Sequence, residues 1–294
     1  MTALLALLAQ TIRIAVPYLF AASGGVVAER AGVVSLTLEG FMLAGAFAAT
    51  LGSHYTGSAW AGVLCGVAAG LLLGLVHAVA SIRYRADQIV AGIAINLLAV
   101  GLTRFFLNLA FDSSSNSPRV PGFGVTGRSG GVLGALTNPL VWLGLLAIPV
   151  VAFVIYRTPF GLRVRAAGEK PEAAESLGVR VAPVRYLAVA ASGVLAALGG
   201  AYLALDQHQF TDQMTAGRGL IALAAVIFGR WDPLRTGLAC LLFAAAETLQ
   251  IQLQGSQAIP SQFVAMIPYA LTIVALAGVV GRSTPPAALG RAEA

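Results

Sequence analysis

The stretch RTPFGLRVRAAGEKPEAAESLGVRVAPVR, residues 157–185, separates two long apolar runs of this chain. Six of its residues are basic, and Lys170 among them is the only lysine in the protein. Because Lys and Arg are retained on the inner side of a membrane, this stretch is predicted to be a cytoplasmic loop. A short helix is expected within it: Pro171 can open the helix, Glu172 and Glu175 favour its positive N-terminal end, and Gly178 can close it.

The composition indicates that lipid is the principal solvent of this chain. Hydrophobic residues make up 58% of it and charged residues only 10%, whereas a soluble domain normally carries about 25% charged residues. The mean hydropathy is +0.84 and the isoelectric point is near 9.8. Most of the net charge of +6 falls in predicted inner loops, so it is a topology signal and does not point to a nucleic-acid partner. Cys65 and Cys240 lie within apolar runs and are predicted to be inert packing residues.

The predicted fold is all-α: a polytopic membrane protein of about 8–10 transmembrane helices, some of them broken or re-entrant. Apolar runs of roughly 20 residues can cross the hydrocarbon core. The predicted spans are 5–27, 33–52, 60–80, 88–110, 138–156, 186–205, 217–229, 236–253 and 262–281. The run at 217–229 is short enough to be a half-helix, and 112–137 is predicted to be an outer loop. Residues 1–281 are expected to form a single transmembrane domain, followed by a short cytoplasmic tail, 282–294.

The distribution of arginines agrees with this layout. With 157–185 inside, alternation also places the following residues inside: Arg30, Arg83, Arg85, Arg230, Arg235, Arg282 and Arg291. The C-terminus is therefore predicted to be cytoplasmic and the N-terminus external. Arg13 and Pro17 interrupt the first span, and an interfacial first helix would reverse the side of the N-terminus.

Glycines at four-residue spacing mark one predicted helix face for close packing, namely Gly62, Gly66, Gly70 and Gly74. Trp60, Trp142 and Trp231 lie at predicted span ends and are expected to form an aromatic belt. Arg218, between two glycines, is expected to cap a helix or to pair with Asp206 or Asp212.

The sequence contains no motif for energy transduction. A phosphate-binding loop needs G-x-x-x-x-G-K-[ST], and Lys170 stands instead in G-E-K-P. His54, His77 and His208 are far apart, and no G-x-S-x-G motif is present. We therefore expect no catalytic residue, no metal site and no cofactor. If the chain pumps a solute, a second polypeptide must supply the energy.

Four blocks of the sequence resemble permeases of bacterial ABC importers of the nucleoside and simple-sugar type, which are related to branched-chain amino-acid and ribose permeases. They are GGVVAERAGVVSLTLEGFMLAGAF (24–47), ADQIVAGIAINLLAVGLT (86–103), TPFGLRVRAAGEKPEAA (158–174) and GRGLIALAAVIFGRWDP (217–233). The resemblance implies ATP-binding cassette subunits docked inside, an external substrate-binding protein or lipoprotein, and a location in the bacterial plasma membrane. The compact chain resembles the shorter of two different permeases, so a second, longer permease is expected.

The resemblance leaves the substrate class open. A nucleoside is favoured, and a simple sugar or a branched-chain amino acid is the alternative. Two other classes compete with an ABC permease. A secondary transporter would need a proton or sodium relay, for which Glu39 and Glu247 are candidates, and a structural membrane subunit would need none.

Polar and aromatic residues of two predicted spans are candidates for the substrate pathway: Glu39, Asn96, Phe41, Met42, Ser35 and Gln88. Glu39 can accept hydrogen bonds from ribose or base groups, or it can serve as a structural partner of Arg30 or of a backbone amide at a helix break. Asn96 can read a base edge or form an interhelical hydrogen bond. Phe41 and Met42 can stack on a base or pack against other helices. Ser35 stands where the family pattern has asparagine, which weakens its assignment, and Gln88 is near the inner end of its helix.

The resemblance also assigns residues that couple the permease to the ATPase. They are Gly161, Arg163, Arg165, Gly168, Glu169, Pro171, Glu172, Ala174 and Gly178. A charged loop beside membrane spans is more commonly a topology determinant. The helix signals within the loop are what favour a coupling role.

Overall fold

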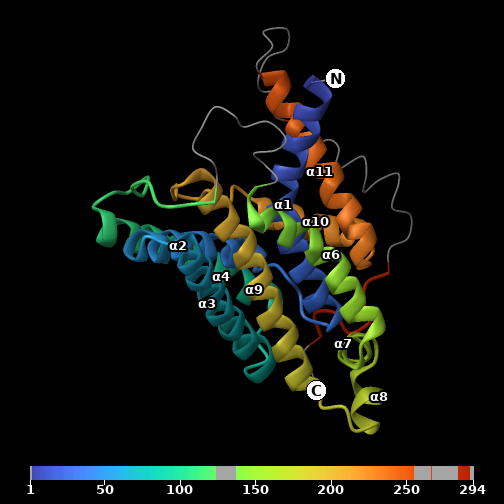
Figure 1. Cartoon of the computed structure of the whole chain (residues 1–294). Coiled ribbons are helices and arrows are strands. Elements are labelled where there is room, and N and C mark those ends of the chain that lie inside the picture. Colours follow the sequence, from blue (N-terminus) through green and yellow to red (C-terminus); the bar gives the residue numbers. More distant parts are fainter. Residues whose placement is uncertain (1, 124–136, 255–265, 267–283, 292–294) are drawn as a thin grey trace.

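The computed structural model describes residues 2–123, 137–254, 266 and 284–291, and its secondary structure there is helical (Figure 1). The elements are α1 (Thr2–Arg30), α2 (Leu38–Thr56), α3 (Ala59–Ala78), the π-helical turn η1 (Val79–Arg83), α4 (Gln88–Phe111), α6 (Pro139–Arg157), α7 (Pro159–Glu169), α8 (Pro171–Ser176), α9 (Val181–Gln207), α10 (Arg218–Phe228) and α11 (Pro233–Gln254). One isolated antiparallel bridge joins Asn116 to Thr211. The predicted all-α fold is confirmed.

Within the described residues, six helices are long and apolar enough to cross a membrane. They are Ala6–Arg30, Ala59–Arg83, Gln88–Phe111, Pro139–Arg157, Val181–Gln207 and Pro233–Gln254, and each overlaps a predicted span. The short predicted run is the 11-residue helix α10, as expected of a half-helix. The predicted span 262–281 lies outside the described residues.

The predicted span 33–52 corresponds to α2, which begins later, at Leu38, and is surrounded by protein. It packs against α3, α4, α9 and α10. Phe41 and Met42 on it are 1% and 0% exposed. Because protein rather than lipid surrounds this helix, it can carry the polar residues Glu39 and Ser53 and still lie within the bundle.

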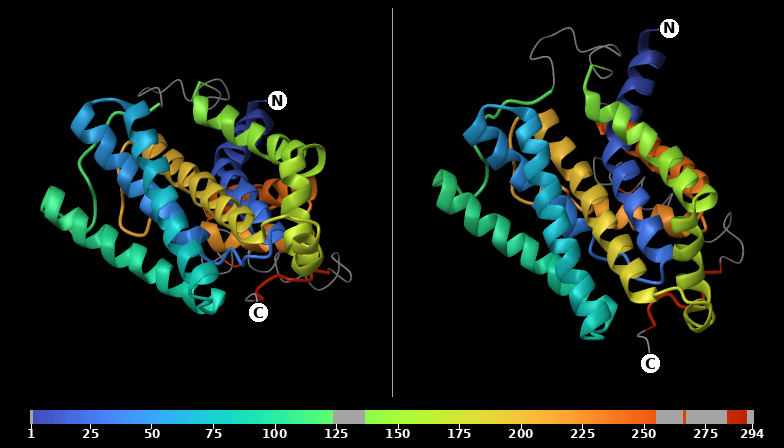
Figure 2. Two further views of the ribbon diagram at one scale, coloured as in Figure 1. Left: turned by 90° about the horizontal axis from the view of Figure 1, so that it is seen from below. Right: turned by 60° about the horizontal axis from the view of Figure 1, so that its bottom comes forward.

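Helix α9 lies between two groups of helices and packs against both (Figures 1 and 2). Helices α2, α3 and α4 lie on one side of it, and α1, α6, α10 and α11 lie on the other. The predicted glycine face of α3 packs as expected, since Gly66 faces the Gly45 carbonyl of α2 and Gly74 faces Val189 of α9. On α9, Gly200 lies so close to the Met42 carbonyl that a Cβ atom would overlap it. Backbones therefore approach closely where these helices cross.

Helices α7 and α8 lie at one end of the bundle, which we call the α7–α8 end (Figure 1). The Thr2 end of α1 lies at the opposite end. Only one helix was predicted in the loop, and it is α8, followed by Gly178 at a φ of 82°. Helix α7 was not predicted, although Thr158 caps it by accepting from the Gly161 amide at 3.1 Å.

Candidate functional site

The central feature of the site is the non-helical segment 31–37 that separates α1 from α2, which we call the α1–α2 break. A break inside a membrane protein leaves amides and carbonyls that lipid cannot satisfy. Side chains from other helices supply the missing partners. The Val34 amide donates to Gln88 Oε1 at 2.8 Å, and the Ser35 amide donates to Glu29 Oε1 at 3.1 Å.

Asn96 bridges both sides of the start of α2. Its Nδ2 donates to the Leu36 carbonyl at 2.9 Å, and its Oδ1 accepts from the Gly40 amide at 2.8 Å. Gln88 and Asn96 lie two turns apart on α4, and Gly92 between them contacts Leu36. One face of α4 thus holds the α1–α2 break.

Glu39 joins the first turn of α2 to the beginning of α10. Its carboxylate accepts from the Thr215 hydroxyl at 2.6 Å and from the amides of Gly217 and Gly219 at 2.8 and 2.7 Å. Amides at the start of a helix lack intrahelical partners, and the helix dipole favours a negative charge there. Hydrogen bonds to a charged group contribute about 1.5–3 kcal/mol each. Together they offset the cost of placing a charged side chain within a membrane span, which is roughly 2.5–3.5 kcal/mol.

Glu29 and Arg30 anchor the turn between α10 and α11. The Trp231 indole N–H donates to Glu29 Oε2 at 2.5 Å, and Arg30 Nε donates to the Trp231 carbonyl at 2.8 Å. Trp231 is 5% exposed and Glu29 is 2% exposed. The expected place of Trp231 in an aromatic belt is therefore wrong, because its indole pairs with a buried carboxylate. Sequence analysis also missed Glu29, whose only signal was its position beside Arg30 at the end of an apolar run.

Three ion pairs join charged residues in or next to the apolar helices. Arg218 bonds Glu247 at 2.7 Å, so its expected pairing with Asp206 or Asp212 is wrong. Asp206 instead pairs with Arg13, and Asp212 pairs with Arg104. Tyr18 completes the Arg218 pair by donating to Glu247 at 2.5 Å.

Three of the predicted pathway residues meet at the α1–α2 break: Ser35, Gln88 and Asn96. Glu39 follows the break in the first turn of α2 and bonds the start of α10. Ser35 also donates its hydroxyl to the Gly25 carbonyl at 3.3 Å. Phe41 and Met42 are packed in the hydrophobic core. In this conformation the polar groups bond backbone, and their contact with a transported solute stays a prediction.

The predicted coupling residues divide into packed and exposed groups. Gly161, Gly168 and Ala174 are buried, whereas the following are exposed: Arg163, Glu169, Glu172 and Gly178. Glu175, which belongs to the predicted helix, is exposed as well. Arg165 is half-buried and lies over the Tyr156 ring at 5.5 Å. Pro171 begins α8.

Two exposed leucines in this region were not singled out from the sequence. Leu162 on α7 and Leu177 after α8 are 61% and 85% exposed. Both lie outside the long apolar helices.

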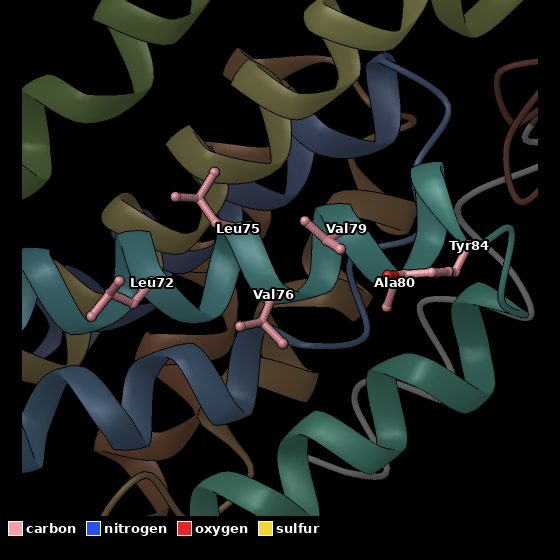
Figure 3. A pocket seen from close by; sticks show the side chains of 6 residues that line it. All are labelled: Leu72, Leu75, Val76, Val79, Ala80 and Tyr84. Atoms are coloured by element: carbon pink, nitrogen blue, oxygen red, sulfur yellow. The ribbon is translucent and has the colours of Figure 1, made fainter.

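An apolar groove of about 450 Å³ runs along the outer surface of α3 and η1 (Figure 3). It is lined by Leu72, Leu75, Val76, Val79, Ala80 and Tyr84. The groove offers almost no polar surface, so it fits a lipid-facing helix better than a site for a polar solute. Within the described part of the chain, no three His, Cys, Asp or Glu side chains are grouped closely enough to hold a metal ion.

We predict that Asn96→Leu lowers the free energy of unfolding by about 1–3 kcal/mol, because it leaves the Gly40 amide and the Leu36 carbonyl without partners. Asn108→Leu is the matched control, since Asn108 is an exposed residue of the same helix. Thermal unfolding of both purified variants in detergent measures the difference. Equal melting temperatures would contradict the role of Asn96.

Known proteins resemble this chain along most of its length. A family described as "Branched-chain amino acid transport system / permease component" matches residues 7–276. The "Guanosine ABC transporter permease protein NupQ" of Bacillus subtilis is 38% identical, over 95% of this chain and 93% of that protein. The "Nucleoside ABC transporter permease protein NupC" of Lactococcus lactis is 36% identical, over 93% and 92%. A "Putative glucose ABC transporter permease protein" of Haloferax volcanii is 38% identical, over 84% and 78%.

The fold also matches a solved structure, described as "An inward-facing conformation of a putative metal-chelate type ABC transporter". The TM-score is 0.52 at 16% sequence identity, over 92% of this chain and 85% of that chain. The extent of the family match, the full-length relatives and the shared fold agree with one another. This multi-pass membrane protein belongs to the branched-chain amino acid transport system permease family, and it is a transport subunit of an ABC importer rather than an enzyme.

Proposed function

We propose that this chain is a permease subunit of a nucleoside importer. The observation that carries this proposal is its similarity, over more than nine-tenths of its length, to permeases named for guanosine and for nucleosides. A permease of an ABC importer works with ATP-binding subunits and with a substrate-binding protein. Glucose is the alternative substrate, because a relative named for it is equally identical over a shorter length.

The α7–α8 end is proposed to face the cytoplasm of a bacterial cell, and the bundle to lie in the plasma membrane. Arg30, Arg163, Arg230 and Arg235 belong to segments that meet at this end, as the positive-inside rule requires of a cytoplasmic face. The described C-terminal residues 284–291 are also at this end. The N-terminus is then external and the C-terminus cytoplasmic.

The proposed surface for the ATPase consists of α8 with the exposed parts of α7. Glu172 and Glu175 form no ion pair with another described residue, and Leu177 is 85% exposed. Acidic groups around one hydrophobic side chain suit insertion into a cleft of a second protein. The buried small residues of α7 and α8 pack behind this surface and hold it against the bundle; they are Gly161, Gly168 and Ala174.

The substrate path is proposed to follow α2 and α4, past Glu39 and Asn96. Both side chains are half-buried, and both stand at a helix break, where transporter sites commonly lie. An importer that receives its substrate from a binding protein needs only weak contacts along the path. Glu39 and Asn96 already form hydrogen bonds with the backbone, so each would have little capacity left for a solute and would hold it only weakly.

Cysteine labelling tests this path. In a background with Cys65→Ala and Cys240→Ala, Glu39→Cys or Asn96→Cys should react with a water-borne thiol reagent in at least one nucleotide state. Phe41→Cys is the control, because that side chain is 1% exposed and should stay unreactive. If neither test position reacts in any nucleotide state, the path lies elsewhere.

Charge reversal tests the coupling surface. The double variant Glu172→Lys with Glu175→Lys should lower uptake and substrate-stimulated ATP hydrolysis by about tenfold, equivalent to ~1.4 kcal/mol of docking energy. Asp112→Lys reverses one charge on the exposed residue that follows α4, away from α7 and α8, and should change neither rate. Unchanged rates in the double variant would remove α8 from the coupling surface.

Reconstitution tests both the substrate and the proposed second, longer permease. Proteoliposomes that contain this chain, the second permease, the ATPase subunits and the binding protein should take up radiolabelled guanosine. Excess unlabelled nucleoside should compete, and excess glucose or leucine should not. If only glucose competes, the proposed nucleoside substrate is wrong and a sugar takes its place. Uptake by a complex that holds only copies of this chain would contradict the second permease.

A further inference from the structure

Residues 284–291 return to the bundle at the α7–α8 end, and we call this segment the strap. The Ala288 amide donates to the Gly168 carbonyl at 2.9 Å, and the Gly290 amide donates to the Gly32 carbonyl at 3.2 Å. The Ala287 amide approaches the Glu169 carboxylate at 3.4 Å. The strap therefore bonds two separate elements, the end of α7 and the α1–α2 break.

The two elements that the strap joins also touch each other. Gly168 lies directly against the Arg30 carbonyl, and a Cβ atom at Gly168 would overlap it. Gly32, at a φ of 92°, lies against both Gly168 and the Ala288 carbonyl. Arg185 of α9 adds hydrogen bonds to the carbonyls of Ala31 and Ala167 at 3.1 and 3.4 Å. These contacts stack the strap, the α1–α2 break and the end of α7 in one cluster.

The strap is packed as well as hydrogen-bonded. Ala288 is 3% exposed, and Leu289 packs against the main hydrophobic cluster. The Leu289 amide donates to the Pro286 carbonyl at 3.0 Å and closes a turn. Ala287 and Arg291 face solvent. The strap therefore lies against the bundle in one defined orientation, with Ala288 facing inward and Ala287 facing outward.

We propose that the strap makes α7 and the α1–α2 break move as one body. When the ATPase displaces α7 and α8, the displacement passes to Gly32 both through Gly168 and through the strap. From the break it reaches Asn96 of α4 and, through Glu29 and Trp231, the turn before α11. This inference rests on the proposed coupling role of α7 and α8, and it assigns the strap a part in transmission, not in ATPase docking.

The first test inserts a large charged side chain under the strap. Ala288→Arg should detach the strap and lower uptake at least fivefold, while the assembled complex still hydrolyses ATP, so that more ATP is consumed per solute. Ala287→Arg is the matched control on the adjacent exposed residue, and its uptake should stay within twofold of the parent. If Ala288→Arg fails to accumulate, Ala288→Pro removes the amide that bonds Gly168 with a much smaller change in side-chain size and should give the same loss.

The second test fixes the strap in place. In the background with Cys65→Ala and Cys240→Ala, Glu169→Cys and Ala287→Cys can be joined by a short crosslinker that carries a thiol-reactive maleimide at each end. A strap that moves together with α7 predicts that uptake by this double-cysteine variant is the same before and after crosslinking. Loss of uptake would mean that the strap must release during transport, which overturns the proposal.

The outcomes separate this inference from the coupling assignment. Normal coupling in the Ala288 variants, together with a defect in the Glu172 and Glu175 variant, would overturn the strap alone. Normal coupling in both sets would overturn the coupling role of α7 and α8 as well.

Discussion

The structure depends on one constraint: the backbone between α1 and α2 leaves the helix inside a membrane protein, and every amide and carbonyl there needs a partner. Lipid offers none. Glu29, Gln88 and Asn96 supply these partners from α1 and α4. The same requirement fixes the position of α4, which contacts the remainder of the bundle mainly through α2. A lost partner at the break would therefore affect more than one helix.

The break also explains why a carboxylate is tolerated at position 39. Segment 31–37 lets α2 begin within the bundle, so that its first turn faces the first turn of α10. Two helix starts brought together would place unpartnered amides side by side. Glu39 resolves this by accepting from Gly217 and Gly219. Its charge thus satisfies a local need of the backbone before any contact with a solute is considered.

Sequence analysis predicted the features that depend on local pattern. Hydrophobic length gave the long helices, four-residue spacing gave the packing face of α3, and proline with glycine marked α8. It could not predict contacts between distant residues, such as Trp231 with Glu29, 202 positions apart. Helix α7 was missed because its arginines were interpreted as topology signals, and Thr158 with Pro159 was not weighed as a helix start. The sequence pointed to Ser35, Gln88 and Asn96 as polar residues of apolar spans. It did not show that all three take part in the backbone hydrogen bonds of one segment.

The α7–α8 end combines a rigid part with an exposed part. Helix α7 is held by Gly161 beneath α6, by Gly168 against Arg30, and by Arg165 over Tyr156, whose hydroxyl bonds Asp232 at 2.8 Å. Helix α8 is short, and its acidic groups face outward. A force applied to an exposed tip does mechanical work on the bundle only if the element behind it does not yield. Close glycine contacts provide that stiffness, because packed interiors transmit strain and have low compressibility. In the coupling role proposed above, the tight packing of α7 is what links this six-residue helix to the α1–α2 break.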